Sequence, residues 1–138
     1  MKKYESSQKQ ILKNRELIYN QLSDLRNLEA YKDRIPQDKV KNLSFTEDCI
    51  SMDVDPVGNV ELKIIEREEP KVIKFAAGNI PVDLNLWIQL VSVDVEDTRM
   101  KVTIKANIPM MLRPMLGNKL DKAADQVADM IAQLLNAQ

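Results

Sequence analysis

From residue 40 onward, apolar and polar side chains alternate with a period of two, the pattern of strands that bury one face. The alternation is clearest near the end of this region, where Met100, Val102 and Ile104 are separated by lysine and threonine. Residues that favour turns, such as Pro and Gly in 55–58 and 78–81, interrupt the pattern. The sequence therefore predicts six consecutive antiparallel strands, at 40–47, 49–54, 59–67, 72–77, 84–95 and 100–108.

The residues before this region follow other patterns. Residues 5–12 are polar but suit an edge strand, and the apolar positions of 13–22 fit one face of a helix. A second short helix is expected to begin at Ser23 or Asp24, whose side chains can cap free backbone amides. This helix ends before Pro36, because the residue preceding a proline is disfavoured in helical geometry.

After Pro109 the chain is expected to form one long helix that extends to Ala137, with Pro114 in its first turn or in a preceding short helix. A spacing of about 100° per residue separates its side chains into an apolar stripe and a polar face. The predicted inward stripe is Leu112, Leu116, Leu120, Ala123, Val127, Met130, Ile131 and Leu134, and the predicted outward face is Asp121, Lys122, Asp125, Asp129 and Gln133. The helix is therefore expected to cover one face of the sheet.

The composition narrows the class of protein. With 138 residues, 44% apolar and 30% charged, the chain is expected to form one globular domain over residues 1–138. A formal net charge of −1 provides no overall field for a phosphate backbone, so nucleic acid is not an expected partner. No signal peptide is expected, because residues 4–10 are polar where an apolar run would be needed. No membrane span is expected either, because no later segment approaches the ~20 apolar residues that a span needs. We infer a cytoplasmic location.

The chain has no histidine and a single cysteine, Cys49. Serine-triad, Cys–His and histidine-ligated metal chemistry are thereby excluded, and neither a metal nor another cofactor is expected. Cys49 is expected to be a small buried residue of a strand. The carboxylates lie at turns or at outward strand positions, where charge normally stays solvated.

Three segments carry a resemblance to a known family: residues 18–25 (Ile-Tyr-Asn-Gln-Leu-Ser-Asp-Leu), 86–90 (Leu-Trp-Ile-Gln-Leu) and 124–128 (Ala-Asp-Gln-Val-Ala). With the order of one strand, two short helices, six strands and a long helix, the chain resembles the START-like superfamily, also called SRPBCC, over essentially its whole length. This superfamily includes pollen allergens, lipid-transfer domains and polyketide cyclases. The resemblance implies an α+β helix-grip fold, in which a curved antiparallel sheet of about seven strands wraps around the C-terminal helix. It also implies an apolar cavity between sheet and helix, used in relatives for lipids, sterols, quinones or polyketide intermediates.

Apolar residues on the expected inner surface are the candidate ligand contacts. They are Phe45, Met52, Phe75, Leu86, Ile88, Met100, Ile104, Met110, Met111, Met115 and Val127. Methionines suit a pocket for apolar ligands because their side chains are flexible and polarizable, and Met110, Met111 and Met115 are favoured because strand and helix meet there. Core packing explains the methionines equally well.

Two further features leave alternatives open. The small residues Ala123, Ala124 and Ala128 either leave a void for a ligand or let the helix approach the sheet closely. Trp87 shares a strand phase with Asn85 and Gln89, and the more aliphatic opposite phase indicates that this row points outward.

The leading functional hypothesis is the binding of a hydrophobic small molecule in the cavity without catalysis, because the inward stripes are almost uniformly aliphatic. One alternative is a cyclase- or hydrolase-type enzyme on the same fold, which a buried carboxylate or tyrosine in the cavity would favour, Tyr19 and Tyr31 being nearest to an expected entrance. Another is a protein-interaction module with a filled core. It would contact a protein partner through a patch that includes Trp87, Val91 and Val93, or form a homodimer through a sheet edge.

Overall fold

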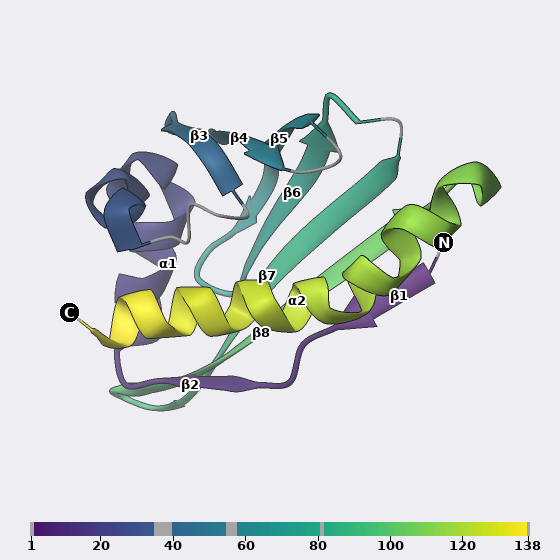
Figure 1. Cartoon of the computed structure of the whole chain (residues 1–138). Helices are drawn as coiled ribbons and strands as arrows, with labels where there is room; N and C mark the ends of the chain where they lie inside the picture. Colours follow the sequence, from purple (N-terminus) through teal and green to yellow (C-terminus); the bar gives the residue numbers. More distant parts are fainter. Residues whose placement is uncertain (1, 35–39, 55–57, 81, 138) are drawn as a thin grey trace.

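The computed structural model describes residues 2–34, 40–54, 58–80 and 82–137, without the side chains of residues 40, 115–118 and 121. Its eight-stranded antiparallel sheet has the order β1-β8-β7-β6-β5-β4-β3, and β2 also pairs with β8. Figure 1 shows the long helix α2 lying across one face of this sheet. The strands are β1 (Lys2–Glu5), β2 (Lys9–Ile11), β3 (Val40–Phe45), β4 (Cys49–Val54), β5 (Gly58–Glu68), β6 (Val72–Gly78), β7 (Asp83–Asp94) and β8 (Asp97–Asn107). This architecture is the helix-grip fold and confirms the predicted fold class.

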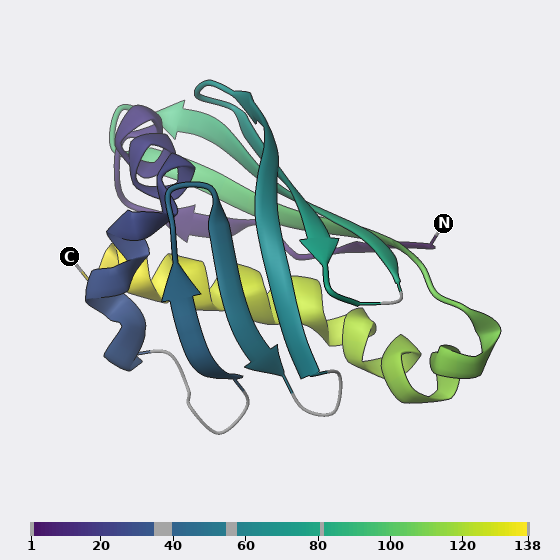
Figure 2. The same ribbon diagram turned by 90° about the horizontal axis from the view of Figure 1, so that it is seen from above.

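The strands from β3 to β8 pair consecutively, as the alternating pattern predicts. The bounds of β4 are those predicted, and the other five strands differ from their predicted ranges by at most three residues at either end. The predicted turn residues 55–57 and Pro81 lie outside the described residues. In Figure 2 the strands are seen from above, curving around one side of α2.

The predicted first strand, 5–12, is wrong in its extent, because the chain forms two shorter strands on either side of Ser6 and Ser7. Both pair with β8, as the partners Lys2↔Ala106 and Lys9↔Met100 show. The buried Ser6 hydroxyl accepts a hydrogen bond from the Val102 amide at 2.9 Å, in place of a backbone carbonyl. The Ser6 side chain therefore provides a hydrogen-bond acceptor for the Val102 amide of β8 where the strand is interrupted.

Two helical segments close one end of the sheet. The helix α1 (Arg15–Ser23) is capped by Asn14, whose side-chain oxygen accepts from the Glu16 amide at 3.0 Å. The predicted second helix is a 3₁₀ helix, η1 (Leu25–Arg34), and the Asp24 side chain accepts from the Arg26 amide at 3.1 Å. Pro36, at which this segment was predicted to end, lies outside the described residues.

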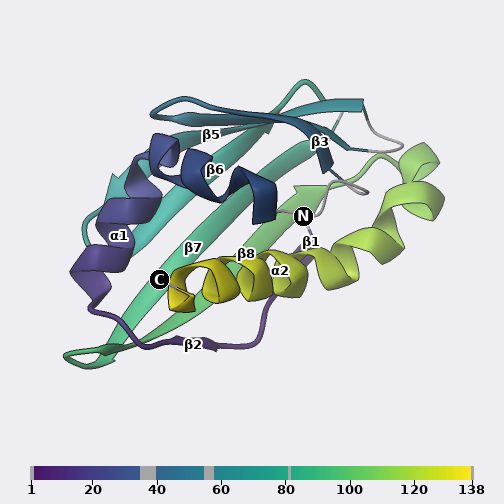
Figure 3. The same cartoon turned by 60° about the vertical axis from the view of Figure 1, so that its left-hand side comes forward.

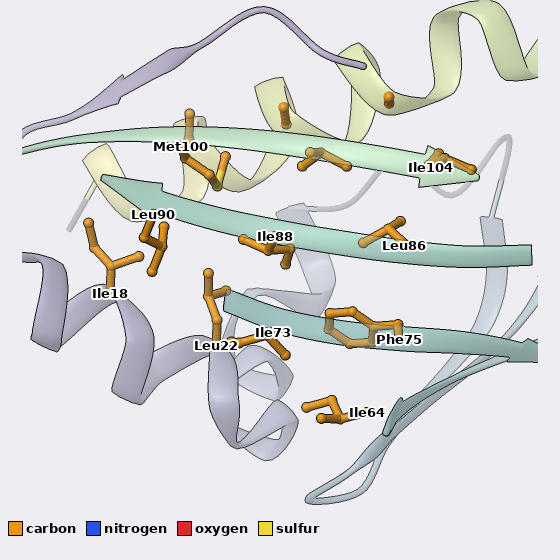
Figure 4. Close-up of a cluster of buried hydrophobic side chains, with 14 of the residues drawn as sticks. Ile18, Leu22, Ile64, Ile73, Phe75, Leu86, Ile88, Leu90, Met100 and Ile104 are labelled. Carbon is orange, nitrogen blue, oxygen red and sulfur yellow. The ribbon is translucent and has the colours of Figure 1, made fainter. Parts of the chain in front are cut away.

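The inner and outer faces of the sheet differ as the sequence predicts. Leu86, Ile88 and Leu90 of β7 are buried in the core, which Figure 4 shows in close-up. Trp87 lies on the opposite face, with its ring centroid 5.1 Å from Lys74 Nζ and 5.5 Å from Lys105 Nζ. The indole therefore packs under two lysine side chains on the outer surface and does not face the core.

A short 3₁₀ helix, η2 (Met110–Leu112), leads into α2 (Arg113–Asn136), which has Pro114 in its first turn as predicted. The most buried side chains of α2 are Ala124, Ala128 and Leu135. The predicted inward stripe is therefore displaced: the alanines face the sheet, and Val127, Met130, Ile131 and Leu134 lie to one side of them.

The predicted outward position of Asp125 and Asp129 holds in part: both side chains are about half exposed, but both also contact Lys9 of β2. Lys9 Nζ lies 2.8 Å from the Asp129 carboxylate and 3.2 Å from that of Asp125, which ties β2 to α2. Asp125 also accepts from the Ser7 amide at 3.0 Å, and Asn136 accepts from the Leu12 amide at 3.0 Å. The helix is thus attached to the segment that contains β1 and β2 along one flank. No helix in the described part of the chain is both long and apolar enough to cross a membrane.

Candidate functional site

A cavity of about 230 Å³ lies between α2 and the strands β3 to β7. Figure 3 shows this arrangement, with β3 and β5 on one side, α2 on the other, and β7 and β8 behind them. The residues that line the cavity are all apolar: Leu22, Leu25, Leu28, Leu43, Phe45, Ile50, Met52, Leu62, Phe75, Leu86, Ile88, Val127, Met130, Ile131, Leu134 and Leu135. The site is therefore suited to apolar surface and not to charge.

The base of the cavity consists of Phe75 from β6 together with Leu86 and Ile88 from β7. Phe75 and Leu86 are directly paired across the two strands, and both are almost fully buried. Period-two alternation brings these side chains to the same face, since successive strand residues point to opposite faces. The base thus follows directly from the inward phase of the two strands.

One wall comes from the edge of the sheet and the other from the helix. Ile50 of β4 pairs with Leu62 of β5, and both point into the cavity beside Phe45 and Met52. Opposite them lie five side chains of the C-terminal half of α2: Val127, Met130, Ile131, Leu134 and Leu135. Leu22, Leu25 and Leu28, from α1 and η1, close one end.

Among the described residues, no ionisable or polar side chain lines this cavity. Tyr19 is buried at 3% exposure but packs in the core outside the lining, and burial raises the pKa of its phenol. Burial likewise raises the pKa of the Cys49 thiol, which is half-buried and not fully buried as expected. The lining itself therefore offers desolvation and shape, with no group positioned for proton transfer or nucleophilic attack.

Six of the predicted contact residues come together in this cavity: Phe45, Met52, Phe75, Leu86, Ile88 and Val127. Met100 and Ile104 are buried in the core but do not line it. Both belong to β8, which packs against α2 itself, so their side chains have no access to the space beside the helix.

Of the three methionines favoured from the sequence, Met110 and Met111 do not line this cavity. Met110 and Met111 are 77% and 92% exposed, because η2 carries the chain beyond the end of β8 before α2 begins. The side chain of Met115 lies outside the described residues. The junction between strand and helix is therefore not where the structure places the cavity.

Ten lining residues were not selected from the sequence: Leu22, Leu25, Leu28, Leu43, Ile50, Leu62, Met130, Ile131, Leu134 and Leu135. Several carry a usable signal, since Leu43 shares its strand phase with Phe45, and Ile50 shares its phase with Met52. The contribution of η1 had no such signal, because its packing depends on how the sheet curves.

The open alternative about the small residues of α2 is answered by geometry for Ala124 and Ala128. Ala124 and Ala128 are 1% and 0% exposed and do not line the cavity, so they allow close approach of helix and sheet.

Val91 and Val93 at the end of β7 are 56% and 58% exposed. Whether they contact a protein partner stays a prediction.

The chain matches no protein-family model, and no curated protein is similar to it in sequence. Solved structures, however, share its fold. Norcoclaurine synthase from Thalictrum flavum, a point mutant in complex with a transition-state analogue, superposes with a TM-score of 0.77 at 13% identity, covering 97% of this chain and 93% of that one. A conserved protein from Geobacillus kaustophilus gives 0.66 at 18% identity, covering 98% and 94%.

A START superfamily protein from Mycobacterium smegmatis superposes with a TM-score of 0.60 at 15% identity, covering 96% of this chain and 98% of that one. Together with the topology and the position of α2, these similarities show that the chain has the START-like, or SRPBCC, fold. The predicted resemblance is confirmed at the level of the fold.

Proposed function

We propose that this protein binds a hydrophobic small molecule in the cavity between α2 and the sheet, without catalysing its conversion. The observation that carries the proposal is a cavity of about 230 Å³ whose sixteen lining residues are all apolar. Transfer of apolar ligand surface out of water contributes roughly 25 cal/mol per Å² buried, which provides the driving force. The absence of ionisable groups from this lining argues against the enzyme alternative.

The cavity size restricts the ligand. Its volume is below the ~300–1,000 Å³ of pockets that enclose drug-sized ligands. A small apolar molecule, or the hydrocarbon end of a lipid, quinone or polyketide-like compound whose polar end stays outside, therefore fits better than a large ligand enclosed whole. One of the proteins that share the fold, norcoclaurine synthase, is seen with a transition-state analogue, which supports the use of this fold for small molecules. The proposed setting is the cytoplasm.

A protein-contact role is the second candidate, and a specific surface favours it. Val91, Val93 and Val95 are all more than half exposed on one end of β7 and in the following turn. Neighbouring exposed valines are a feature of contact surfaces, although isolated ones are common on any protein. This role would use the opposite end of the strand from Leu86 and is compatible with ligand binding.

The test is to purify the protein without denaturation, extract it with organic solvent and identify the extracted compounds by mass spectrometry, alongside a thermal-shift screen of fatty acids, sterols and quinones. Val127→Trp introduces a large ring into the cavity and is expected to abolish both co-purification and any ligand-induced rise in melting temperature. Gln126→Trp adds the same ring one residue away, at an exposed position, and should leave both unchanged.

An extract without any stoichiometric compound, combined with no thermal shift across the screen, would contradict the proposal. Equal binding by the wild type and Val127→Trp would show that the ligand lies elsewhere. Circular dichroism of both variants confirms that the fold is retained before either result is interpreted.

A further inference from the structure

A second depression, of about 390 Å³, lies over β6, β7 and β8 and draws on the face of the sheet that is turned away from the cavity. Its lining contains Arg15, Lys71, Arg99 and Lys101 together with Gln8 and Gln89, and it contains no carboxylate. In Figure 1 this face lies behind the sheet as seen from α2. Four cations around one hollow contrast with the formal net charge of −1 of the whole chain.

The pairing of three strands brings these side chains together. Gln89 of β7 lies between Val72 of β6 and Lys101 of β8 in one row, and Arg99 is paired with Val91 in the next. Lys71 precedes β6, where its carbonyl accepts from the Leu90 amide at 2.8 Å and so fixes that part of the chain. Arg15 enters from the first turn of α1.

Two of the four positive charges are compensated within the protein. Lys101 forms an ion pair with Glu5, and Arg99 Nε lies 3.2 Å from an Asp97 oxygen. In the described part of the chain, neither Arg15 nor Lys71 forms an ion pair or a side-chain hydrogen bond. The depression therefore carries an excess of two positive charges.

The neutral groups of the lining also favour an anion. Gln89 Oε1 accepts from the Thr103 hydroxyl at 3.0 Å, so the amide nitrogen is the end of the Gln89 side chain that can donate to a ligand. Arg15 Nε is buried without a hydrogen-bond partner among the described residues, an uncommon condition for a charged donor. The lining thus contains hydrogen-bond donors of arginine, lysine and glutamine, which are side chains that recognise oxyanions.

We propose that this outer depression binds a phosphate group, carried by a small soluble molecule, at a site separate from the apolar cavity. An excess of two positive charges matches a phosphomonoester, which carries close to two negative charges at pH 7. The guanidinium of Arg15 and the ammonium of Lys71 are its principal partners, and the Gln89 amide orients it. This site is independent of the proposed apolar ligand, because the depression and the cavity share no lining residue.

The probe is glycerol 3-phosphate, titrated into the ¹⁵N-labelled full chain at low salt and followed by NMR. We expect saturable shifts of the Gln89 side-chain amide and of the backbone amides around Lys71 and Arg99. Arg15→Gln and Lys71→Gln should each raise the dissociation constant about tenfold, because each substitution removes one charge-assisted hydrogen bond. Lys122→Gln, at an exposed position of α2, is the matched control and should bind like the wild type.

The proposal is overturned if the shifts are absent, or if Lys122→Gln weakens binding as much as the other two variants. Lys71 is exposed, so Lys71→Gln is expected to fold and keeps the test valid should Arg15→Gln fail to fold. Vesicles that contain phosphatidic acid distinguish the two sources of phosphate: co-sedimentation with vesicles without any response to glycerol 3-phosphate would contradict a soluble ligand.

Discussion

Ala124, Ala128 and Ala132 set how closely α2 approaches the sheet. All three are buried, and the elements that pack against α2 are β8, β1 and β2. On the same helix, Val127 and Met130 are turned toward the cavity. Small residues on one side and larger ones beside them place the free space next to the helix and not beneath it.

Ala128→Leu tests this assignment. Because Ala128 is fully buried where helix and sheet are in contact, the larger side chain is expected to destabilise the fold by about 1–3 kcal/mol through overpacking. For a chain of this length, the melting temperature should fall by about 4 °C for each kcal/mol of destabilisation. Gln126→Leu, at an exposed position, should melt like the wild type. An unchanged melting temperature with lost ligand binding would instead place Ala128 in the cavity.

At the scale of elements, the polar contacts of α2 in the described part of the chain lie mainly along one flank, apart from a hydrogen bond from Arg113 Nε to the Ile108 carbonyl. The contacts along this flank run from Asp125, Asp129 and Asn136 to the residues between Ser7 and Leu12. The hydrogen bond from the Ser7 amide, followed by the contact with Lys9, lowers the pKa of Asp125. The pKa of Lys9 is raised, chiefly by its hydrogen bond to Asp129.

These directions fix the expected pH dependence. A carboxylate whose pKa is lower in the folded state stabilises the fold fully above its unfolded pKa of about 3.9, and this contribution is lost as the pH falls through the folded value. Asp125→Asn should therefore melt a few degrees below the wild type at pH 7, and this difference should shrink as the pH approaches 3. Asp83→Asn, at an exposed position, is the control. A difference that stays constant from pH 7 to pH 3 would contradict an ionic contribution from Asp125.

The sequence predicts individual elements better than their contacts. Alternation fixed the phase of β7 and β8, so Leu86, Ile88, Met100 and Ile104 were all expected to point inward, and all are buried. Only Leu86 and Ile88 reach the cavity. The difference arises because β8 packs against α2, whereas β7 is the next strand of the sheet, on the cavity side of β8. Relative placement of this kind depends on sheet curvature, which periodicity does not encode.

Ionic contacts between segments that are distant in the chain could not be predicted from the sequence either. A helical spacing places Asp125 and Asp129 away from the apolar stripe, which normally means exposure to solvent. The Lys9 side chain approaches them only because β2 runs beside α2 in the folded chain. A polar face in the sequence therefore does not distinguish a solvated helix surface from an ion pair with a neighbouring strand.

At the scale of the whole molecule, the sheet separates two environments. Its inner side and α2 enclose an apolar cavity, and the depression on its outer side is lined by four cations. The formal net charge of −1 conceals this separation, because acidic residues elsewhere balance the basic ones. Composition thus identified the absence of an overall field correctly but had no information about local fields.

The central claim, that an apolar ligand occupies the cavity beside α2, is tested most directly by isotope-filtered NOE spectroscopy of the ¹³C-labelled protein with the uncharged apolar probe N-phenyl-1-naphthylamine. Contacts from the probe to the methyl groups of Ile88, Val127 and Ile131 are expected, since Ile88 lies in the base of the cavity and Val127 and Ile131 lie in its helix wall. Contacts confined to exposed side chains such as Val91, Val95 and Met110, with none to the cavity methyls, would contradict the account.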